Sequence, residues 1–566
     1  MGIDGQKLDA IRSERTELEN HYIDELVAGH LDRRSFLRRG AVLGMSASVM
    51  GAVLAACGSA NTTGKPANSA TSSSGSGQVT KGGTLKLANP TPATDMNPML
   101  VDDAGGCAML TQTGEFLTFD NNLKLQLEPM LATKWTHNGD GSMWTFQLRS
   151  GVKFSNGQAM TADDVVYTFQ QLSDPKNASN ALSTFKGVLT PSGVKKVDSG
   201  TVAFHLEAPN GNFPYIVSSD NYNAIIVPQG TDFGKWAKTF IGTGPFTLKS
   251  YSTNQGANFV ANPNYWGGRP HLDATAFTFY GSQQPQILAL QGGSVDAIVS
   301  FVPSGAQAIL ANPNQYSIIK YKSSQHRELS MRTDQPPFND ARVRQAIAYS
   351  LDRPAMVQAL LQGYGQVGND SPFAPMFPST NPSVPQRTQN IAKAKQLLSA
   401  AGHPSFTTSL ATEQYEEVPQ LATVIQQSAS KIGVKINLKV ETQSQYYGKA
   451  TFGNSDWLDA TMSLVDYGDR GVPNVFLESP LATGGPWNAA HFNSKTYDTL
   501  VRQYVAAVDL QSQKRIAGKI EQLLLDETPL VIPYFIDGLT ASTPKVHGLN
   551  PTSIQQIFLK DAYIDA

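Results

Sequence analysis

The sequence predicts an α/β fold with more than one domain, and three observations support this prediction. The chain has 566 residues of ordinary composition, which is enough material for a large packed core and for more than one domain. Segments that alternate apolar and polar residues, as half-buried strands do, are interleaved along the chain with segments of helical periodicity. No internal repeat is detectable, so a solenoid or a propeller is not expected.

The folded part is expected to begin near Lys81, where two glycines precede a short strand in the sequence GGTLKLAN. Another strand is predicted over residues 143–149, because apolar side chains alternate onto one face of MWTFQLR. Residues 161–169 predict a helix. Thr161 is its N-cap, and Asp164 three residues later completes a variant of the capping box.

The rest of the chain continues this mixture of strands and helices. Strands are predicted over residues 201–206 and 434–440, and residues 242–251 predict a tight turn that leads into another strand. The run NDARVRQAIAYSLDRPAMVQALL predicts two successive helices, the second with Asp352 as its N-cap and Pro354 in its first turn. An amphipathic helix over residues 390–401 is expected to end at Gly402.

The segment that precedes the folded part carries signals of export. Arg33 and Arg34 lie just before Phe36 and an apolar run over residues 40–56, an order that resembles the twin-arginine export signal. The run has about 17 residues and is diluted by glycine and serine, so it is short for a transmembrane helix. An uncleaved signal anchor or a buried helix is the alternative interpretation.

The end of the apolar run indicates a lipid anchor. The sequence LAAC, which ends at Cys57, resembles the lipobox of bacterial lipoproteins, in which the cysteine receives a diacylglycerol and becomes the new N-terminus. Residues 1–57 are therefore predicted to be a signal peptide that is cleaved before Cys57. Residues 58–80 are rich in Gly, Ser and Thr and predict a flexible linker between the lipid and the folded part.

Composition excludes several classes of function. A formal net charge of -2 gives no field that would hold a polyanion, so nucleic acid is not an expected partner. The chain has two cysteines, Cys57 and Cys107. Because the first is the predicted lipidation site, no disulfide framework or four-ligand zinc site is expected. No cofactor and no metal are predicted.

Six stretches, in order along the chain, carry a family resemblance: LEPMLATKW, WTFQLRSGVKFSNGQAMTADDVVYTF, GTGPFTLKSY, ANPNYWGG, LQGGSVDA and FNDARVRQAIAYSLDR. In these the chain resembles the solute-binding proteins of the peptide and nickel family, the extracytoplasmic receptors of ABC importers. The resemblance implies a two-lobed fold of the periplasmic-binding-protein type, in its large form with an extra domain inserted in lobe one. Hinge motion between the lobes would enclose the solute.

The resemblance also implies domain bounds, a location and partners. Lobe one is expected to comprise residues 81–325 plus 530–566, with the inserted domain at about 126–235, and lobe two residues 326–529. The protein would be exported, held at the outer face of the cytoplasmic membrane by its lipid and monomeric. It would pass a peptide or peptide-like solute to a membrane permease. A nickel chelate, an opine-like compound and a saccharide are the alternative solutes.

The best candidate for a ligand contact is the stretch SLVDYGDRGVPNVFL, in which a strand is expected to end before Asp466. The resemblance implies that Asp466 pairs with the α-ammonium of the solute, beside Tyr467. The chain departs from the peptide-binding pattern because Arg470 stands where proline is common. Its guanidinium suits a carboxylate or a phosphate. The alternative is that Asp466 and Asp469 are turn residues and Arg470 a salt-bridge partner.

Three further residues are candidates. Glu115 matches an acidic position on a cleft-facing segment of the family, and Cys107 precedes it in the sequence GGCAML. A lone thiol is more often a small buried hydrophobe than a reactive group. Trp487 can stack on a ligand or lie in a core.

No enzyme is predicted. Gly363, Gly365 and Gly368 spell a dinucleotide fingerprint, but they follow a predicted helix instead of a strand, so they are interpreted as a helix stop and a loop. The sequence STFK at residues 183–186 lacks the further elements of penicillin-recognising enzymes. A secreted enzyme or a chaperone-like protein on the same fold is the alternative from a different class.

Overall fold

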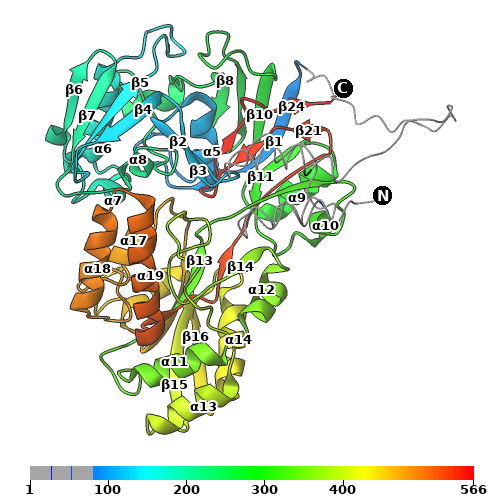
Figure 1. The fold of residues 1–566 in the computed structure, drawn as a ribbon. Helices are drawn as coiled ribbons and strands as arrows, with labels where there is room; N and C mark the ends of the chain where they lie inside the picture. Colours follow the sequence, from blue (N-terminus) through cyan, green and yellow to red (C-terminus); the bar gives the residue numbers. More distant parts are fainter. Residues whose placement is uncertain (1–26, 28–52, 54–80, 566) are drawn as a thin grey trace. The chain divides into compact units, whose positions relative to one another are not determined.

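The structure, a computed structural model, describes residues 81–565 together with residues 27 and 53 (Figure 1). Residues 78–566 form one compact unit. The predicted export signal with Arg33, Arg34 and Phe36, the lipidation site Cys57 and the linker over residues 58–80 lie outside the described residues. In the described part of the chain, no helix has the length and apolarity needed to cross a membrane.

The first sheet has seven strands in the order β12-β20-β11-β1-β10-β9-β8. Its central strand β1 runs parallel to both β10 and β11, whereas the outer strands are antiparallel. The strands are β1 (Thr84–Pro90), β8 (Phe246–Ser252), β9 (Gly256–Ala261), β10 (Ala274–Tyr280), β11 (Ala297–Phe301), β12 (Ser317–Tyr321) and β20 (Gly538–Ser542). Helices near this sheet are α5 (Ala104–Thr113), α9 (Gln283–Gln291) and α10 (Gln307–Leu310).

The second sheet also has seven strands, in the order β14-β19-β13-β17-β15-β16, with β18 paired to β13. They are β13 (His326–Met331), β14 (Gly365–Val367), β15 (Phe406–Glu413), β16 (Val434–Glu441), β17 (Met462–Tyr467), β18 (Leu530–Val531) and β19 (Tyr534–Ile536). Its helices are α11 (Ala341–Ser350), α12 (Arg353–Leu361), α13 (Ile391–Ala400), α14 (Val418–Ser430), α15 (Gln443–Tyr447), α16 (Asp456–Asp459), α17 (Asn474–Glu478), α18 (Lys495–Ala506) and α19 (Leu510–Glu527).

A separate four-stranded sheet, β4-β5-β7-β6, lies within residues 132–205. Its elements are β4 (Ala132–His137), β5 (Met143–Leu148), α6 (Ala162–Ser173), α7 (Leu182–Phe185), β6 (Val194–Asp198) and β7 (Thr201–His205). The same part of the chain holds β2 (Thr118–Asn121), β3 (Gln126–Pro129), α8 (Phe213–Ile216) and the 3-10 turns η1 (Pro175–Asn177), η2 (Pro191–Gly193) and η3 (Phe233–Lys238). Its buried side chains share one continuous hydrophobic core with the first sheet.

The chain passes between the two large sheets twice. It leaves β12 at Tyr321 and enters β13 at His326, and it leaves β19 at Ile536 and enters β20 at Gly538. We therefore call residues 81–321 plus 538–565 the first lobe and residues 326–536 the second lobe. In Figure 1 the second lobe is one uninterrupted green-to-orange stretch, whereas the first lobe combines blue and green segments with the red C-terminal segment.

The second crossover differs from the predicted bound at residue 530. Strands β18 and β19 still pair with β13 of the second sheet, so the return to the first sheet comes after Ile536. The first lobe also contains two short pairs near the C-terminus, β21 (Val546–His547) with β24 (Tyr563–Ile564) and β22 (Asn550–Pro551) with β23 (Ile557–Phe558).

Local sequence signals match the observed elements. Thr161 and Asp164 form the predicted capping box at the start of α6, with the Thr161 backbone N–H donating to Asp164 Oδ2 at 2.7 Å. Asp352 caps α12 by accepting from the Ala355 backbone N–H at 3.1 Å, and Pro354 lies in the first turn. The predicted loop over residues 363–368 is wrong in part, because residues 365–367 form β14 and pair with β19.

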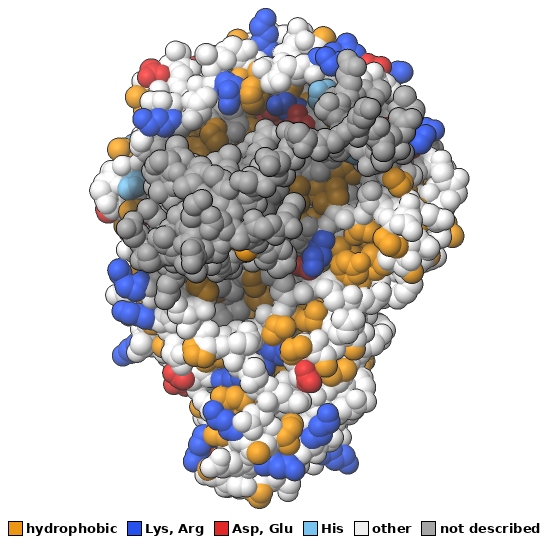
Figure 2. All heavy atoms as spheres, turned by 45° about the vertical axis from the view of Figure 1, so that its right-hand side comes forward, with side chains coloured by type: hydrophobic (Ala, Val, Ile, Leu, Met, Phe, Trp, Pro, Cys, Tyr) orange, Lys and Arg blue, Asp and Glu red, His pale blue; other side chains and the backbone are white. Residues whose placement is uncertain are grey.

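Side chains of Lys and Arg are scattered over the face shown in Figure 2, with acidic, apolar and uncharged side chains between them. No continuous basic surface is visible on that face among the described residues. This distribution offers no track for a phosphate backbone there.

Candidate functional site

A cavity of about 300 Å³ lies where the parallel strands of the two large sheets end. The first lobe lines it with Pro90 at the end of β1, Tyr280 at the end of β10 and Phe301 at the end of β11. The second lobe adds Tyr415 and Glu416, which follow the end of β15. In open α/β sheets, ligands bind at the carboxyl ends of the strands. This cavity is therefore the first candidate for a ligand site.

Both crossovers between the lobes also line this cavity. The first contributes Tyr321 and Ser323, and the second contributes Asp537, followed by Gly538 at the start of β20. Only glycine fits at position 538, because a β-carbon there would collide with the Tyr321 ring. Any motion of the lobes about these two short connections would change the width of the cavity.

Three polar side chains gather at this end of the second sheet. The Tyr447 hydroxyl on α15 lies 2.9 Å from both Glu413 Oε1 and Asp466 Oδ1, so it donates to one carboxylate at a time. The backbone N–H of Asp466 donates to Glu413 Oε1 at 3.3 Å. Burial, together with the neighbouring Asp466 carboxylate, raises the pKa of Glu413 to about 7. A proton is therefore available within this group near neutral pH.

Arg327 on β13 is the cation that balances these carboxylates. It is fully buried, and its Nη2 atom donates to Glu416 Oε2 at 2.7 Å and to Glu417 Oε2 at 3.0 Å. In the register of the sheet, Arg327 is paired with Asp466 on β17. Glu416, Glu417 and Asp466 act on this guanidinium, and Glu413 lies beside Asp466. The excess of acidic groups favours a ligand with a positive charge.

Glu416 also has an unusual backbone. Its φ angle of 41° lies in the left-handed region, which costs free energy for a residue with a side chain. This conformation directs the chain from the end of β15 into α14, and Glu416 both lines the cavity and contacts Arg327. Strained residues of this kind are concentrated at binding sites.

The predicted residue Arg470 lies beside the first crossover. Its backbone N–H donates to Ser324 Oγ at 2.8 Å, and its Nη1 atom donates to the backbone oxygen of Asp469 at 2.7 Å. Asp469 Oδ1 in turn accepts from the backbone N–H and the hydroxyl of Ser324, at 2.5 Å and 3.0 Å. These contacts connect the end of β17 to the crossover between the lobes.

Tyr467 and Trp487 form an aromatic cluster. Their rings stack at 6.0 Å between centroids, and both belong to a hydrophobic cluster that includes Phe476. Tyr467 is 8 % exposed, because successive side chains of a strand point to opposite faces and Asp466 occupies the other one. Trp487 is partly buried against the same cluster. The structure thus brings these two aromatic residues together but separates Tyr467 from the carboxylates.

Glu115 lies in a different cavity, of about 370 Å³, lined by residues of the first lobe. Its carboxylate is buried and accepts from the Tyr265 hydroxyl and Trp266 Nε1, both at 2.7 Å, and from the Thr243 hydroxyl at 2.8 Å. Burial raises the pKa of Glu115 to about 7 although all three donors oppose the rise. The arrangement ties three segments of the first lobe together.

Cys107 is the described free thiol. It lies on α5, is buried in the core of the first lobe, and burial raises its pKa well above the usual value. A thiol in this environment is neutral and unreactive, so the structure supports its interpretation as a small core side chain.

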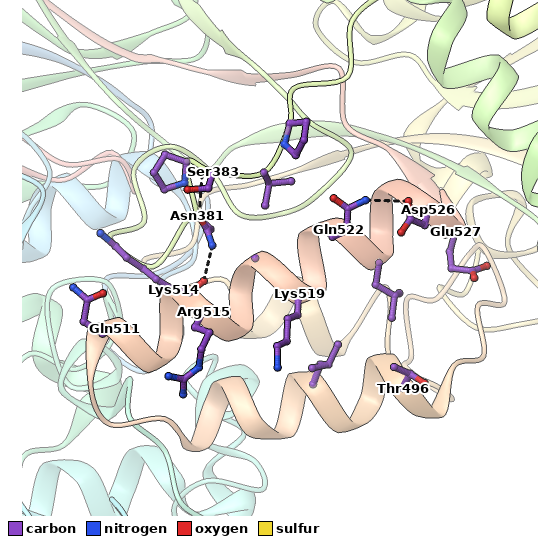
Figure 3. Close-up of a pocket in the computed structure, with 16 residues that line it drawn as sticks. Asn381, Ser383, Thr496, Gln511, Lys514, Arg515, Lys519, Gln522, Asp526 and Glu527 are labelled. Carbon is purple, nitrogen blue, oxygen red and sulfur yellow. Dashed lines mark hydrogen bonds between the residues drawn. The ribbon is translucent and has the colours of Figure 1, made fainter.

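A groove of about 930 Å³ lies on the second lobe between α18, α19 and residues 381–385 (Figure 3). Asn381 Nδ2 donates to the Lys514 backbone oxygen at 3.2 Å, and Gln522 Nε2 donates to Asp526 Oδ1 at 3.0 Å. All lining residues belong to one lobe. Hinge motion between the lobes therefore cannot enclose a ligand there, and this groove is the weaker candidate.

Sequence reasoning missed the residues that make the end of the second sheet acidic. Glu413, Glu416 and Glu417 lie in the stretch TEQYEEV, which follows an alternating strand segment. That position, at the carboxyl end of a strand, was the available signal. Arg327 had no such signal, because its burial depends on strands that are distant in sequence.

Comparisons with known proteins agree with this architecture. Residues 126–478 match the family model described as "Bacterial extracellular solute-binding proteins, family 5 Middle". The heme-binding protein A of Haemophilus influenzae is 28 % identical over 467 residues, which cover 77 % of this chain and 83 % of that protein. The dipeptide-binding protein of Escherichia coli is 26 % identical over 438 residues, which cover 71 % and 80 %.

Solved structures show the same fold. HbpA2 from Haemophilus parasuis superposes with a TM-score of 0.76 at 24 % identity, covering 86 % of this chain and 100 % of that one. The murein tripeptide-binding protein MppA, in its unliganded open form, gives 0.73 at 23 % identity and covers 86 % and 98 %. The prediction of a two-lobed α/β fold for a solute-binding protein is therefore confirmed. The chain belongs to the bacterial extracellular solute-binding proteins of family 5.

Proposed function

We propose that this protein captures peptides with a free amino terminus between its two lobes and delivers them to an ABC permease in the membrane. The observation that carries the proposal is the Asp466 carboxylate, held beside Tyr447 in an acidic group of which Glu416 lines the cavity between the lobes. Relatives named as dipeptide-binding and murein tripeptide-binding proteins support peptides as the class of solute.

An α-ammonium group fits this environment. An ammonium removed from water is costly unless a carboxylate meets it at hydrogen-bonding distance. Glu413 keeps a proton near neutral pH, and this proton reduces the negative charge of the group. A bound ammonium could replace the proton, because it supplies the same positive charge to the two carboxylates. A hydrogen bond to a charged group contributes about 1.5–3 kcal/mol, which corresponds to about a tenfold or greater change in affinity.

The test compares Ala-Ala-Ala with its N-acetylated form by isothermal titration of the full-length protein in detergent. Acetylation should weaken binding more than tenfold, and Asp466→Asn should remove most of that difference. Asp163→Asn is the control, because Asp163 lies exposed on α6 and pairs with Lys196. Equal affinity for the two peptides in the unmodified protein would contradict the role of the ammonium.

Mass spectrometry of the solute released from the purified protein identifies the class directly. A peptide is the expected result. Recovery of a nickel chelate, an opine-like compound or a saccharide instead would show that the peptide proposal is wrong. Incubation with a peptide library tests the alternative from another class, since hydrolysis that one substitution abolishes would indicate an enzyme.

The same proposal includes the location of the protein. Twin-arginine export followed by lipidation of Cys57 would hold a monomeric receptor at the outer face of the cytoplasmic membrane. More than one acyl chain is needed for stable anchoring. Cys57→Ala should therefore move the protein from the membrane fraction to the soluble fraction. Its retention in washed membranes would contradict the anchor.

A further inference from the structure

The cavity that holds Glu115 has no role in the proposed function. We call it the lateral cavity; it has a volume of about 370 Å³ and is lined by residues from the ranges 111–130, 245–266 and 548–561. All of these residues belong to the first lobe, so the lateral cavity is separate from the cleft, whose cavity both lobes line. Its volume lies in the range of about 300–1,000 Å³ that is usual for sites of small ligands.

A large part of the wall of the lateral cavity is apolar. Phe119 on β2 and Phe558 on β23 meet edge to face, with 4.7 Å between their ring centroids. Trp266 forms another part of the wall, and the Arg149 guanidinium lies over its ring at 4.1 Å from the centroid. Leu123 also lines the cavity and is 45 % exposed, so the apolar surface continues out to solvent. An aliphatic or aromatic group of a ligand would be favourably removed from water here.

Glu115 gives the lateral cavity an acidic group with an unused acceptor position. Its side chain is only 2 % exposed. The Oε2 atom accepts two hydrogen bonds, from Thr243 and Trp266, whereas Oε1 accepts one, from the Tyr265 hydroxyl at 2.7 Å. Because a carboxylate has about four acceptor positions, Oε1 can accept one more donor. The three donors in contact with the carboxylate are neutral, and a buried carboxylate is costly without a positive partner.

Lys560 gives the lateral cavity a basic group. A β-carbon at Gly267 would lie 3.2 Å from Lys560 Cε, so the lysine side chain extends beside the segment of residues 265–267. Burial raises the pKa of Glu115 to about 7, and the charge of Lys560 opposes this rise, which places the two groups near each other. Lys560 forms no ion pair with a carboxylate of the described residues. Its ammonium group is therefore free to bind an anionic group that enters the cavity.

The charges and the apolar wall together define a class of ligand. The other charged residues of the lining are Lys124 and Glu128, which pair with each other at 2.7 Å, and the exposed Asp561. A matching ligand carries one positive group, one negative group and an apolar part. We propose that the lateral cavity binds a free amino acid with an apolar side chain, its α-ammonium at Glu115 and its α-carboxylate at Lys560. This site goes beyond the proposed function, because it lies outside the cleft.

The test compares L-leucine with L-leucinamide, which lacks the carboxylate, and with 4-methylpentanoate, which lacks the ammonium. Isothermal titration of the full-length protein in detergent should show that leucine binds at least tenfold more tightly than either. Lys560→Met should reduce the preference over leucinamide to less than twofold, and Glu115→Gln should do the same for the preference over 4-methylpentanoate. Lys519→Met, at an exposed position of α19 in the second lobe, is the control and should leave both preferences unchanged.

Titration of leucine into protein saturated with Ala-Ala-Ala separates the lateral cavity from the cleft. Leucine should still bind with unchanged affinity, whereas displacement by the peptide would place leucine in the cleft and refute the inference. Equal affinity for the three compounds, or no binding of leucine, would also refute it. If both preferences survive in Lys560→Met and in Glu115→Gln, the assignment to these residues is wrong; two variants guard against one that does not fold. Failure of Ala-Ala-Ala to bind would contradict only the proposed function, since leucine and the two variants still test the lateral cavity.

Discussion

Gly471→Ala should weaken ligand binding by obstructing contact between the lobes. A β-carbon at position 471 would collide with the oxygen, the carboxyl carbon and the β-carbon of Asp220. Rotation of the carboxylate alone cannot relieve this collision, because the β-carbon of Asp220 is fixed to its backbone. Overpacking of this kind costs about 1–3 kcal/mol. If closure accompanies binding, the dissociation constant should rise about 5- to 150-fold.

Isothermal titration with Ala-Ala-Ala measures this loss, and small-angle X-ray scattering reports whether the variant is more open. Gly139→Ala is the matched control, because a β-carbon at that exposed turn would meet no atom within 4 Å. Urea denaturation should show a loss of no more than about 1–3 kcal/mol for Gly471→Ala and none for Gly139→Ala, because separation of the lobes would relieve the collision. An affinity for Gly471→Ala within twofold of the unmodified protein would refute contact at this position during binding.

Three further predictions concern stability and are tested by urea denaturation. Asp370→Ala should lower the free energy of unfolding by about 3–5 kcal/mol, because it leaves buried Arg353 and Arg387 without the carboxylate that each contacts at 2.7 Å; a loss below 1 kcal/mol would contradict the ion pairing. Thr161→Ala should cost about 1 kcal/mol through loss of the helix cap, and an unchanged midpoint would count against that cap. Burial raises the pKa of Glu521 to about 7, so stability should fall by about 3 kcal/mol as pH rises from about 4.3 to 7; Glu521→Gln should remove this fall, and persistence of the full fall would assign it to other groups.

Local signals predicted those elements whose causes are local. The capping box of Thr161 and Asp164 and the cap at Asp352 each depend on atoms within three residues of one another. Sequence therefore contains all the information needed for them. The position of the second crossover is not a local signal, because β18 and β19 pair with β13, some two hundred residues earlier.

The residues of the candidate site also fall into two groups, those that the local sequence predicts and those that it does not. Asp466 could be predicted because it lies at the end of an alternating segment and because the family resemblance marks it. Its partners could not, since Tyr447 and Glu413 reach it through α15 and β15, and nothing in their own neighbourhood in sequence indicates a shared site. Tyr467 was placed with Asp466 by adjacency, yet strand geometry sends neighbouring side chains to opposite faces.

The burial of charged side chains in this protein cannot be predicted from the sequence. The residues His326, Arg327 and Glu328 form a polar segment of the sequence, yet all three are buried at the centre of the second sheet. Such burial is stable only when partners arrive from other segments, as Glu416 and Glu417 do for Arg327. A receptor that encloses a charged solute needs some charged side chains in its interior that are not already paired with another group of the protein. The Asp466 carboxylate, which the Tyr447 hydroxyl contacts at 2.9 Å, is therefore the group through which we expect the ligand to be recognised.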